Sequence, residues 1–459
     1  MQRWLNSRYS HSQLLIPSWA PSLNFCPPMN ILFLHRNFPA QFRHLAAQLA
    51  QNPQNRVVFL TARSEDQLKG VEKYLYQVTR SVSPQTHRYV RPLEEAVNDG
   101  QAAWRVAHQL RQQGGFEPDV IYAHIGWGPG LFLLDLFPKA RYLGFFEWYY
   151  HARGSDADFD PADPLDEDGV ARIRVKNAPI LLELAHCAGG VVPTQWQHQQ
   201  FPAEFWPKLK ILHDGIDTGF FQPQPGLRLR WEGLVAPPVT PPPSGVALTP
   251  TIENMPYFWS RSLDLRDCDE LITYVARGME PYRGFPQFMA AVAQVLQRRS
   301  TAQVLIVGED RVAYGKSLAN GKTYAQQSLE TLNLPETVQN RLHFTGRIPY
   351  DRLRQVYQAS AVHVYLTRPF VLSWSMLEAM ACGAVVLGSR TAPVEEVIEE
   401  GVNGFLVDFF DVEAIADRIE DLLDRQGELG PVRQRARETI GDRYDLAKLL
   451  PEHLRWLQG

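Results

Sequence analysis

Residues 366–390, LTRPFVLSWSMLEAMACGAVVLGSR, contain the side chains best suited to chemistry. Ser373, Trp374 and Ser375 open a predicted helix, and serine is favourable at a helix N-terminus. The unpaired backbone N–H groups and partial positive charge of such a terminus suit a phosphate. Glu378 follows one turn later and could accept a hydrogen bond from a ribose or sugar hydroxyl. An ordinary buried helix and strand would have the same pattern, so this stretch alone leaves both interpretations open.

Arginines mark a second place that could bind phosphate. Arg277 ends a predicted strand, and Arg283 and Gly284 lie in the turn before a predicted helix. A guanidinium is a planar fork of donors that stays charged, so a pair of them suits a diphosphate. A surface cluster of salt bridges is the alternative interpretation.

A third place follows the predicted strand 342–346. Gly346 and Arg347 form the turn after it, where backbone groups could hold a nucleobase. In isolation, an ordinary turn between a strand and a helix explains this pair at least as well.

The elements that must position these residues alternate along the chain. Apolar runs typical of buried strands alternate with segments of helical periodicity in both halves of the sequence. This alternation predicts two domains with parallel, doubly wound sheets, which would bind a ligand at the carboxyl ends of their strands. The predicted strands are residues 30–35, 56–61, 119–124, 141–147, 189–194, 210–217, 271–277, 303–308, 342–346, 361–366, 384–389 and 404–408.

Composition sets the division of the chain. Residues 1–28 are polar and broken by proline, so we expect a disordered extension or a mis-assigned start before Met29. Residues 223–268 contain VAPPVTPPPSG without periodicity, which predicts an extended interdomain connection carrying an insertion. We therefore expect an N-terminal domain at residues 29–222, a C-terminal domain at 269–440 and a closing helical segment at 441–459.

The overall composition excludes several classes of protein. The 459 residues, 45% hydrophobic and 21% charged, are typical of a soluble globular protein with more than one domain. A net charge of −4 argues against nucleic-acid binding by bulk electrostatics. The cysteines are scattered and form no CxxC pair, which favours a reducing cytoplasm over a disulfide framework or a zinc site. No apolar run is long enough for a transmembrane helix, although peripheral membrane contact stays open.

The order of motifs in the C-terminal half resembles glycosyltransferase family 4. That half contains Arg277, then Arg283-Gly284, and then IVGED, FTGRIP, LEAMACG and APVEE. The N-terminal half, with HRNFPAQF, AHIGWGPG, GFFEWYY, VVPTQWQ and HDGID, is similar to a bacterial branch of the same family. The resemblance implies the GT-B fold, in which two Rossmann-like domains face each other across a cleft. It also implies retaining, nucleotide-sugar-dependent chemistry and a last helix that packs back toward the N-terminal domain.

The resemblance also assigns roles to the residues of the C-terminal domain. Arg277 and Arg283 fall on the family's basic phosphate ligands, and Glu378 falls on the second of its paired glutamates, which contacts the donor ribose. The first glutamate falls on Phe370, which cannot hydrogen-bond, so the usual contact to the donor sugar is in question. We expect Arg277, Arg283 and Glu378 to act in catalysis, and the donor to contact Gly284, Gly346, Arg347, Ser373, Trp374 and Ser375.

The acceptor side is expected in the N-terminal domain. The family often has a histidine that falls, by position, near Glu147, and we favour Glu147 over His151 as its substitute. His124 and Trp127, in AHIGWGPG, are predicted acceptor-side residues, with packing beneath the cleft as the alternative.

An acidic run follows at residues 156–168. Asp156, Asp158, Asp160 and Glu167 match positions 1, 3, 5 and 12 of an EF-hand loop, but Pro161 occupies the position that needs glycine. We therefore favour a solvated loop, which could face the acceptor, over a calcium site. No metal is required, because the arginines and the helix start can neutralise a diphosphate.

The predicted function is transfer of a sugar, with retention of configuration, from a UDP- or GDP-linked donor to a hydroxyl group. The acceptor is a saccharide, a lipid or a small molecule, and no cofactor is expected. The alternatives are a nucleotide-sugar epimerase of the same fold and a catalytically inactive nucleotide-sugar-binding protein, which Phe370 keeps open. A phosphorylase would need a pyridoxal lysine or a free-phosphate site, and no lysine stands out in the motifs.

Overall fold

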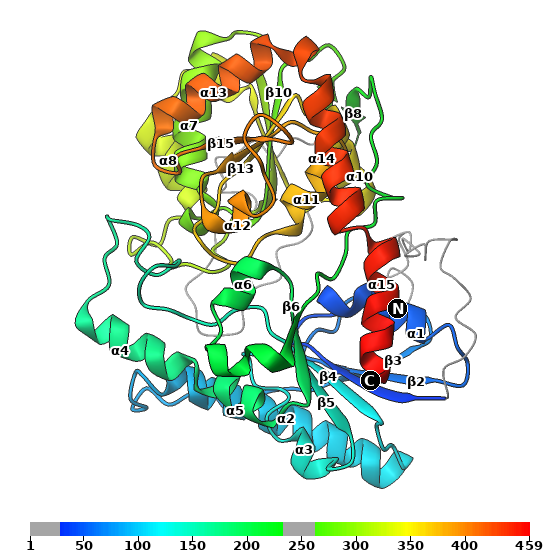
Figure 1. Cartoon of the computed structure of the whole chain (residues 1–459). Helices are drawn as coiled ribbons and strands as arrows, with labels where there is room; N and C mark the ends of the chain where they lie inside the picture. The colour runs from blue at the N-terminus through cyan, green and yellow to red at the C-terminus, as the bar shows by residue number, and fades with distance from the viewer. Residues whose placement is uncertain (1–27, 233–261) are drawn as a thin grey trace, which may run out of the picture. The chain divides into compact units, whose positions relative to one another are not determined.

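The computed structural model describes residues 28–232 and 262–459, which divide into two compact units (Figure 1). The first unit takes the chain up to residue 152, residues 165–215 and residues 447–459. The second unit takes residues 153–164 and 216–446. Most of the predicted N-terminal extension and of the Pro-rich connection lies outside the described residues.

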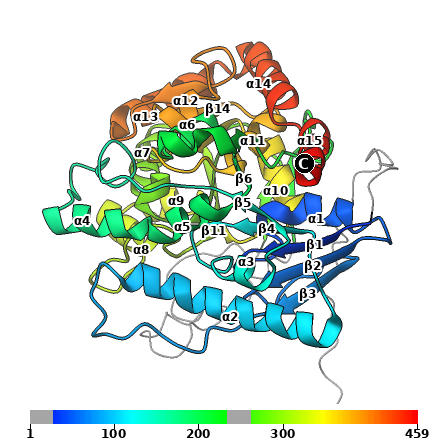
Figure 2. The same cartoon turned by 60° about the horizontal axis from the view of Figure 1, so that its bottom comes forward.

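The first unit is built on a seven-stranded parallel sheet of order β3-β2-β1-β4-β5-β6-β7. Its central strands are apolar and buried on both faces, as expected where helices cover both sides. Figure 2 shows β1, β2 and β3 lying between α1 and α2. The strands are β1 (Asn30–Leu34), β2 (Arg56–Thr61), β3 (Val71–Leu75), β4 (Val120–His124), β5 (Arg141–Phe145), β6 (Gly189–Val192) and β7 (Leu209–Ile211).

Side-chain caps start two helices of the first unit, α4 at Asp166 and α6 at Thr194. The Thr194 hydroxyl accepts a hydrogen bond from the Gln197 N–H and so caps the start of α6. Arg141, at the start of β5, donates hydrogen bonds to the carbonyls of Trp456 and Leu457 near the end of the chain. These bonds fix α15 to this unit. The helices are η1 (Ala40–Phe42), α1 (Arg43–Leu49), α2 (Arg91–Gly114), α3 (Leu133–Leu136), α4 (Glu167–Lys176), α5 (Ala178–His186), α6 (Gln195–Gln199), η2 (Ala203–Lys208) and α15 (Leu446–Gln458).

The second unit has a six-stranded parallel sheet of order β12-β11-β10-β13-β14-β15. The strands are β10 (Leu271–Gly278), β11 (Gln303–Glu309), β12 (Leu342–Gly346), β13 (Val362–Tyr365), β14 (Val386–Ser389) and β15 (Phe405–Val407). The predicted class, α/β with doubly wound parallel sheets, is therefore confirmed in both units. A small two-stranded antiparallel sheet, β8 (Leu229–Trp231) with β9 (Leu263–Leu265), flanks the Pro-rich segment, where the sequence predicted no strand.

Helices cover both faces of the second sheet (Figure 1). One apolar cluster joins the sheet to α7 and α13, and another joins it to α10, α11 and α14. Burial of α11 extends to the small residues Ala379 and Ala381, which let the helix lie close to its neighbours. The helices are η4 (Pro281–Arg283), α7 (Phe285–Arg298), α8 (Tyr324–Leu332), α9 (Glu336–Gln339), α10 (Tyr350–Ala359), α11 (Trp374–Ala381), α12 (Ala392–Glu395), α13 (Val412–Asp424), η5 (Gln426–Glu428) and α14 (Gly430–Arg443).

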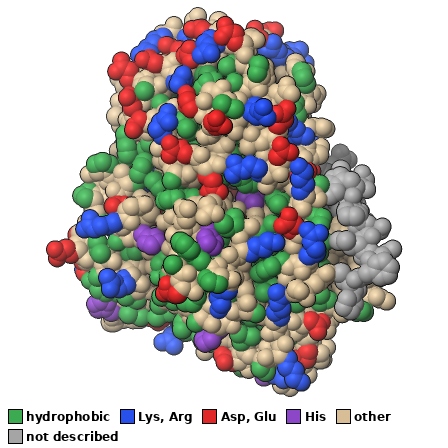
Figure 3. Space-filling model, in the orientation of Figure 1, with side chains coloured by type: hydrophobic (Ala, Val, Ile, Leu, Met, Phe, Trp, Pro, Cys, Tyr) green, Lys and Arg blue, Asp and Glu red, His purple; other side chains and the backbone are tan. Residues whose placement is uncertain are grey.

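The outer surface of α13 and α14 carries acidic and basic side chains interspersed (Figure 3). Several of them form ion pairs along the helices, among them Arg425 with Asp421 and Arg435 with Glu438. These pairs are exposed, so each contributes little to stability. Within residues 28–232 and 262–459, no helix is both long and apolar enough to cross a membrane.

Glu183 on α5 is an ionisable side chain buried in the core of the first unit. The Tyr142 hydroxyl donates to its Oε1 at 2.5 Å. Burial raises the pKa of Glu183 to about 7. The protonated carboxyl is therefore the form that the fold prefers.

We expect Glu183→Gln to flatten the pH dependence of stability. The folded pKa of Glu183 lies above the unfolded value, so the free energy of unfolding of the wild type should fall as pH rises from about 4.5 through 7. The expected fall between pH 5 and pH 8 is about 2–3 kcal/mol, because one pKa unit is worth about 1.4 kcal/mol. Urea unfolding at both pH values measures it, with Glu95→Gln, an exposed change on α2, as the control. An equal fall in the Glu183→Gln protein would contradict this account.

Candidate active site

The guanidinium of Arg283 is buried and hydrogen-bonded in the second unit. Its Nη1 donates to the Tyr365 hydroxyl at 3.0 Å and to Thr367 Oγ1 at 2.7 Å, and its Nη2 donates to the Val371 carbonyl at 3.0 Å. Only 5% of Arg283 is exposed. A buried charge is costly unless hydrogen bonds satisfy it, so these contacts hold the guanidinium in one orientation.

Tyr365 joins this arginine to the start of α11. Its hydroxyl accepts a hydrogen bond from the backbone N–H of Ser373 at 2.9 Å as well as from Arg283. Ser373 is the N-cap residue, and its Oγ accepts from the Ser375 N–H at 3.3 Å. Trp374, half-buried, is the first residue of the helix. The predicted helix start is therefore present, and a single phenol hydroxyl connects it to Arg283.

Glu378 lies one turn further along α11. It is 6% exposed and accepts a hydrogen bond from the Tyr357 hydroxyl at 3.1 Å. Burial, together with the Glu378 carboxylate, raises the pKa of Tyr357 well above its ordinary value. The phenol therefore stays protonated and remains a donor. Glu378 and Ser375 are three positions apart, so they share one face of the helix.

Glycine is required at Gly284, which precedes α7. Its φ is +60°, and a Cβ there would lie 2.5 Å from the Cβ of Leu366. The backbone turn after Arg283 can therefore approach the end of β13 only without a side chain. Gly346, at the end of β12, also has a left-handed φ, of +66°.

Arg277 and Arg347 are exposed side chains near the carboxyl ends of β10 and β12. Neither forms a hydrogen bond or ion pair with another residue in the described ranges. Because the sheet is parallel, these ends lie at the same edge as Tyr365. Contacts thus connect Arg283, Gly284, Ser373 and Ser375, whereas Arg277, Gly346 and Arg347 share only the edge of the sheet.

Glu280 belongs to this region and was missed by the sequence analysis. It is fully buried, and its carboxylate accepts hydrogen bonds from the backbone N–H groups of Ala313, Tyr314 and Gly315 at 2.7–3.1 Å. The Tyr314 ring in turn lies 5.4 Å from the Arg283 guanidinium carbon. Glu280 therefore holds the loop beside Arg283. The one sequence signal was an acid between two arginines in RGMEPYR.

Phe370 takes part in an aromatic cluster. Its ring centroid lies 5.5 Å from that of Tyr282 and 5.3 Å from that of Tyr314. Tyr282 immediately precedes Arg283, so the cluster lies beside the arginine in the fold as well as in the sequence.

The predicted acceptor-side residues lie together in the first unit. His124, which ends β4, is 2% exposed, and its Nε2 lies 3.5 Å from Glu147 Oε2. Trp127 stacks on the His124 ring with the centroids 4.7 Å apart. Gln41 donates to Glu147 Oε1 at 2.9 Å, so the second oxygen of the carboxylate is also held.

Another histidine, missed by the sequence analysis, completes this group. His35 follows β1, and its ring centroid lies 4.4 Å from that of His124. His151, the weaker sequence candidate, instead pairs its Nε2 with the Gln200 carbonyl at 2.7 Å. Adjacent strands β1 and β4 explain the pairing of His35 with His124, and no local pattern in the sequence signals it.

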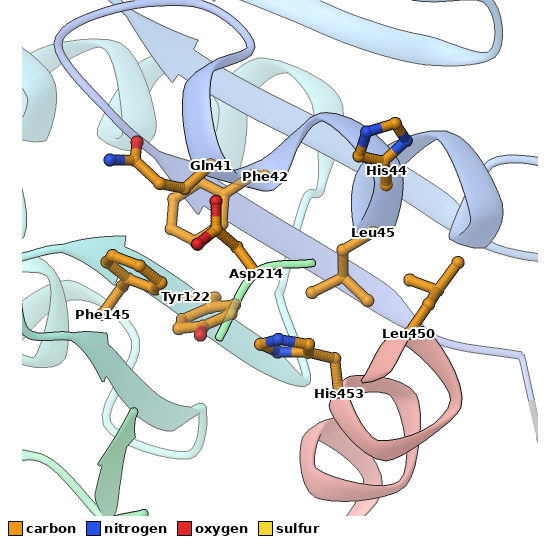
Figure 4. A pocket seen from close by; sticks show the side chains of 9 residues that line it. All are labelled: Gln41, Phe42, His44, Leu45, Tyr122, Phe145, Asp214, Leu450 and His453. Atoms are coloured by element: carbon orange, nitrogen blue, oxygen red, sulfur yellow. The ribbon is translucent and has the colours of Figure 1, made fainter. Parts of the chain in front are cut away.

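A small pocket of the first unit adjoins this group through Phe42 and Phe145. Figure 4 shows its side chains converging from η1, α1, β4, β5, α15 and the segment after β7. Burial lowers the pKa of His44 and of His453 to about 4, so both rings are neutral near pH 7. The lining residues are Gln41, Phe42, His44, Leu45, Tyr122, Phe145, Asp214, Leu450 and His453.

The acidic run is less solvated than predicted. Asp156 is 4% exposed, and Asp160 forms an ion pair with Arg368 at 2.7 Å in the second unit. The ion pair occupies one of the carboxylates that an EF-hand loop would need for calcium. Among the described residues, no three His, Cys, Asp or Glu side chains gather in a way that could hold a metal ion.

Two glycosyltransferase family models together match more than half of the chain. Residues 53–221 match the "Glycosyl transferase family 4 group", and residues 258–440 match "Glycosyl transferases group 1". The chain is 27% identical over 116 residues to N-acetyl-alpha-D-glucosaminyl L-malate synthase of Bacillus anthracis, which is 25% of this chain and 30% of that protein. It is 28% identical over 221 residues to D-inositol 3-phosphate glycosyltransferase of Acidothermus cellulolyticus, which is 47% of this chain and 41% of that protein. The match thus spans less than half the length of either relative.

Comparison with solved structures supports the fold. A structure of Anabaena Alr3699/HepE in complex with UDP and glucose has a TM-score of 0.61 at 14% identity, over 94% of this chain and 99% of that chain. Sucrose-phosphate synthase from Thermosynechococcus elongatus has a TM-score of 0.62 at 16% identity, with the same coverage. At this identity the likeness is one of fold, and it confirms the predicted GT-B class.

We expect Tyr365→Phe to destabilise the protein. The change removes one of the two acceptors of the Arg283 Nη1 and the acceptor of the Ser373 N–H, and leaving such donors unpaired costs about 1–3 kcal/mol. Chemical denaturation should show a lower free energy of unfolding by that amount. Tyr324→Phe, which removes an exposed hydrogen bond to the Lys316 carbonyl, is the control and should change stability by about 0.5 kcal/mol or less. If both variants were equally stable, Tyr365 would not be the connection inferred here.

Proposed function

We propose that this chain, which belongs to glycosyltransferase family 4, transfers a sugar from a nucleotide-diphosphate sugar to a hydroxyl acceptor with retention of configuration. The observation that carries the proposal is the oriented, buried Arg283 connected through Tyr365 to the start of α11. A guanidinium and a helix N-terminus are both suited to phosphate oxygens, and here one hydroxyl fixes both.

In this proposal the second unit holds the donor. Arg277 and Arg283 stabilise the charge that develops on the leaving diphosphate. Glu378 accepts a hydrogen bond from a hydroxyl of the donor ribose, while Gly284, Gly346 and Arg347 contact the nucleotide. Positive groups of the protein neutralise the diphosphate, so the proposal requires no metal or other cofactor.

The first unit would bind the acceptor. His124, Trp127 and Glu147 combine an aromatic face with a carboxylate and an imidazole, which suits a molecule that carries hydroxyl groups. The acceptor proton would pass to the leaving phosphate oxygen, so no protein nucleophile is needed. The acceptor is a saccharide, a lipid or a small molecule. We place the reaction in the cytoplasm, and this location is compatible with peripheral membrane contact.

UDP-linked sugars are the first donors to test. The comparison structure of Anabaena Alr3699/HepE contains UDP and glucose, and that observation concerns a protein of the same fold. GDP-linked sugars form the second arm of the same panel. Phe370, at the position where the family has a glutamate, favours one alternative, a protein that binds nucleotide sugars without cleaving them.

A donor panel separates these functions. Wild-type protein is incubated with UDP- and GDP-sugars, with and without acceptors, and released nucleotide and the anomeric configuration of the product are measured by proton NMR. The proposal predicts cleavage of at least one donor and a product with the donor's anomeric configuration. Inversion would contradict the retaining mechanism, donor isomerisation without an acceptor would indicate an epimerase, and binding without cleavage would indicate the inactive alternative.

We expect Arg277→Ala and Glu378→Gln each to lower kcat/KM for the donor by about tenfold or more, roughly one charged contact in the transition state. Arg277 is exposed, so its removal should leave the fold intact. The glutamine side chain of Glu378→Gln would retain an oxygen for the Tyr357 hydroxyl while losing the charge. Arg435→Ala, an exposed arginine on α14, is the control and should keep full activity. Near wild-type rates in both site variants, with circular dichroism unchanged, would refute the site.

A further inference from the structure

Residues 153–164, which we call the acidic loop, leave the first unit in sequence but pack with the second. Phe159 anchors the loop, with its ring centroid 5.1 Å from those of Phe409 and Phe410. At the edge of the loop, Asp163 pairs with Lys316 at 2.8 Å, and both side chains are largely exposed. The loop is therefore part of the nucleotide-binding unit, although the sequence places it between elements of the other one.

Asp156 connects the acidic loop to the residue before Arg283. Its Oδ2 accepts a hydrogen bond from the Tyr282 hydroxyl at 2.8 Å, and only 4% of Asp156 is exposed. Tyr282 also contributes its ring to the cluster with Tyr314 and Phe370. A carboxylate of the loop thus stands behind the aromatic cluster that adjoins the proposed phosphate site.

Asp160 makes the second connection, through Arg368. The ion pair is 2.7 Å long, and the exposed fractions of the side chains are 7% for Arg368 and 17% for Asp160. The Arg368 guanidinium lies over the Tyr282 ring, 5.0 Å from its centroid. The backbone N–H of Arg368 donates to the Tyr282 carbonyl. Its Nε is buried and has no hydrogen-bond partner among the described residues. A buried donor without an acceptor costs free energy, so the Arg368 Nε–H indicates a place where a ligand supplies an acceptor.

Chain connectivity puts these groups next to the phosphate site. Arg283 follows Tyr282, and Thr367, which accepts from Arg283, precedes Arg368. In a nucleotide sugar the sugar is attached directly to the terminal phosphate. A diphosphate held by Arg283 therefore places its sugar within reach of the neighbouring residues.

We propose that the acidic loop forms the sugar-binding end of the donor site, with Asp156, Asp160 and Arg368 recognising the hydroxyl groups of the transferred sugar. This inference rests on the proposed function. Carboxylates accept from hydroxyls, the free Nε–H of Arg368 donates to one, and the rings of Tyr282, Tyr314 and Phe370 offer apolar faces to the C–H groups of a sugar. The loop thus supplies the carboxylates that position 370 lacks.

The charge balance identifies the class of sugar. Arg368 is neutralised by Asp160. Asp156 adds a further carboxylate. A site without surplus positive charge favours a neutral, hydroxylated sugar over one that carries a carboxylate or a further phosphate.

The test separates the sugar from the nucleotide. Binding of UDP, and of GDP, is measured by calorimetry, and hydrolysis is measured for UDP-glucose, UDP-galactose, UDP-N-acetylglucosamine, UDP-glucuronate and GDP-mannose. The variants are Asp156→Asn and Asp160→Asn, with Asp163→Asn as the control that makes the same change of charge in the same loop. Asp156→Asn keeps an oxygen for the Tyr282 hydroxyl, so it serves if Asp160→Asn unfolds.

The expected result is selective. Affinity for the nucleoside diphosphate should stay within about twofold of the wild type in all variants. Asp156→Asn and Asp160→Asn should lower kcat/KM for the preferred neutral sugar by about tenfold or more and reduce its preference over the other sugars, while Asp163→Asn changes neither.

Other outcomes overturn the inference in distinguishable ways. If wild type binds neither nucleotide and cleaves no donor, the proposed function fails and the inference fails with it. If the nucleotides bind normally but both variants behave like Asp163→Asn, only the inference fails. A parallel loss for nucleotides and for every sugar would show that the loop is a structural strap, and a preference for UDP-glucuronate would contradict the neutral class.

Discussion

The buried guanidinium of Arg283 is the interaction on which the rest of the second unit's site depends. Removing this charge from water is costly, and the cost is offset only because the Tyr365 hydroxyl, Thr367 Oγ1 and the Val371 carbonyl accept its hydrogen bonds. All three acceptors come from the stretch between the end of β13 and α11, so the arginine sets the path of the loop that leads into the helix. The position of Ser373, and with it the start of α11, follows from the same hydroxyl that holds the arginine.

The strands best predicted from the sequence are those buried on both faces of a parallel sheet. Residues 56–61 and 342–346 were predicted at their observed bounds, because continuous apolar runs between turns have few other ways to fold. The edge strand β3 was missed because VEKYL is half-exposed and lacks that pattern. The predicted strand 210–217 ends at Ile211, since the polar residues HDGID lead out of the sheet. The two-stranded sheet of β8 and β9 was missed because its strands lie far apart in the sequence, on either side of the Pro-rich segment.

The same distinction applies to the candidate site. Arg283, Ser373 and Glu378 were identifiable because local features, a strand end and a capped helix, determine their positions. Tyr365 lies in the apolar run AVHVYL and was interpreted as core, although its hydroxyl connects two parts of the site. The contact between Tyr282 and Asp156 joins residues 126 positions apart, and no local pattern announces it. The acidic loop was interpreted as solvated for the same reason. Its partners, Tyr282 and Arg368, lie far from it in the sequence, and only the folded second unit brings them next to it.

Hydrogen–deuterium exchange of the full chain, with and without saturating UDP, tests the central claim most directly. The claim is that the second unit binds a nucleoside diphosphate between the turn at Arg283 and the start of α11. We predict slower exchange of the backbone amides of residues 283–285 and 373–376 when UDP is bound, since a bound diphosphate would hold both segments in their folded conformation and make their local opening rarer. Unchanged exchange at both segments under conditions where UDP binds, or protection confined to the first unit, would contradict the account.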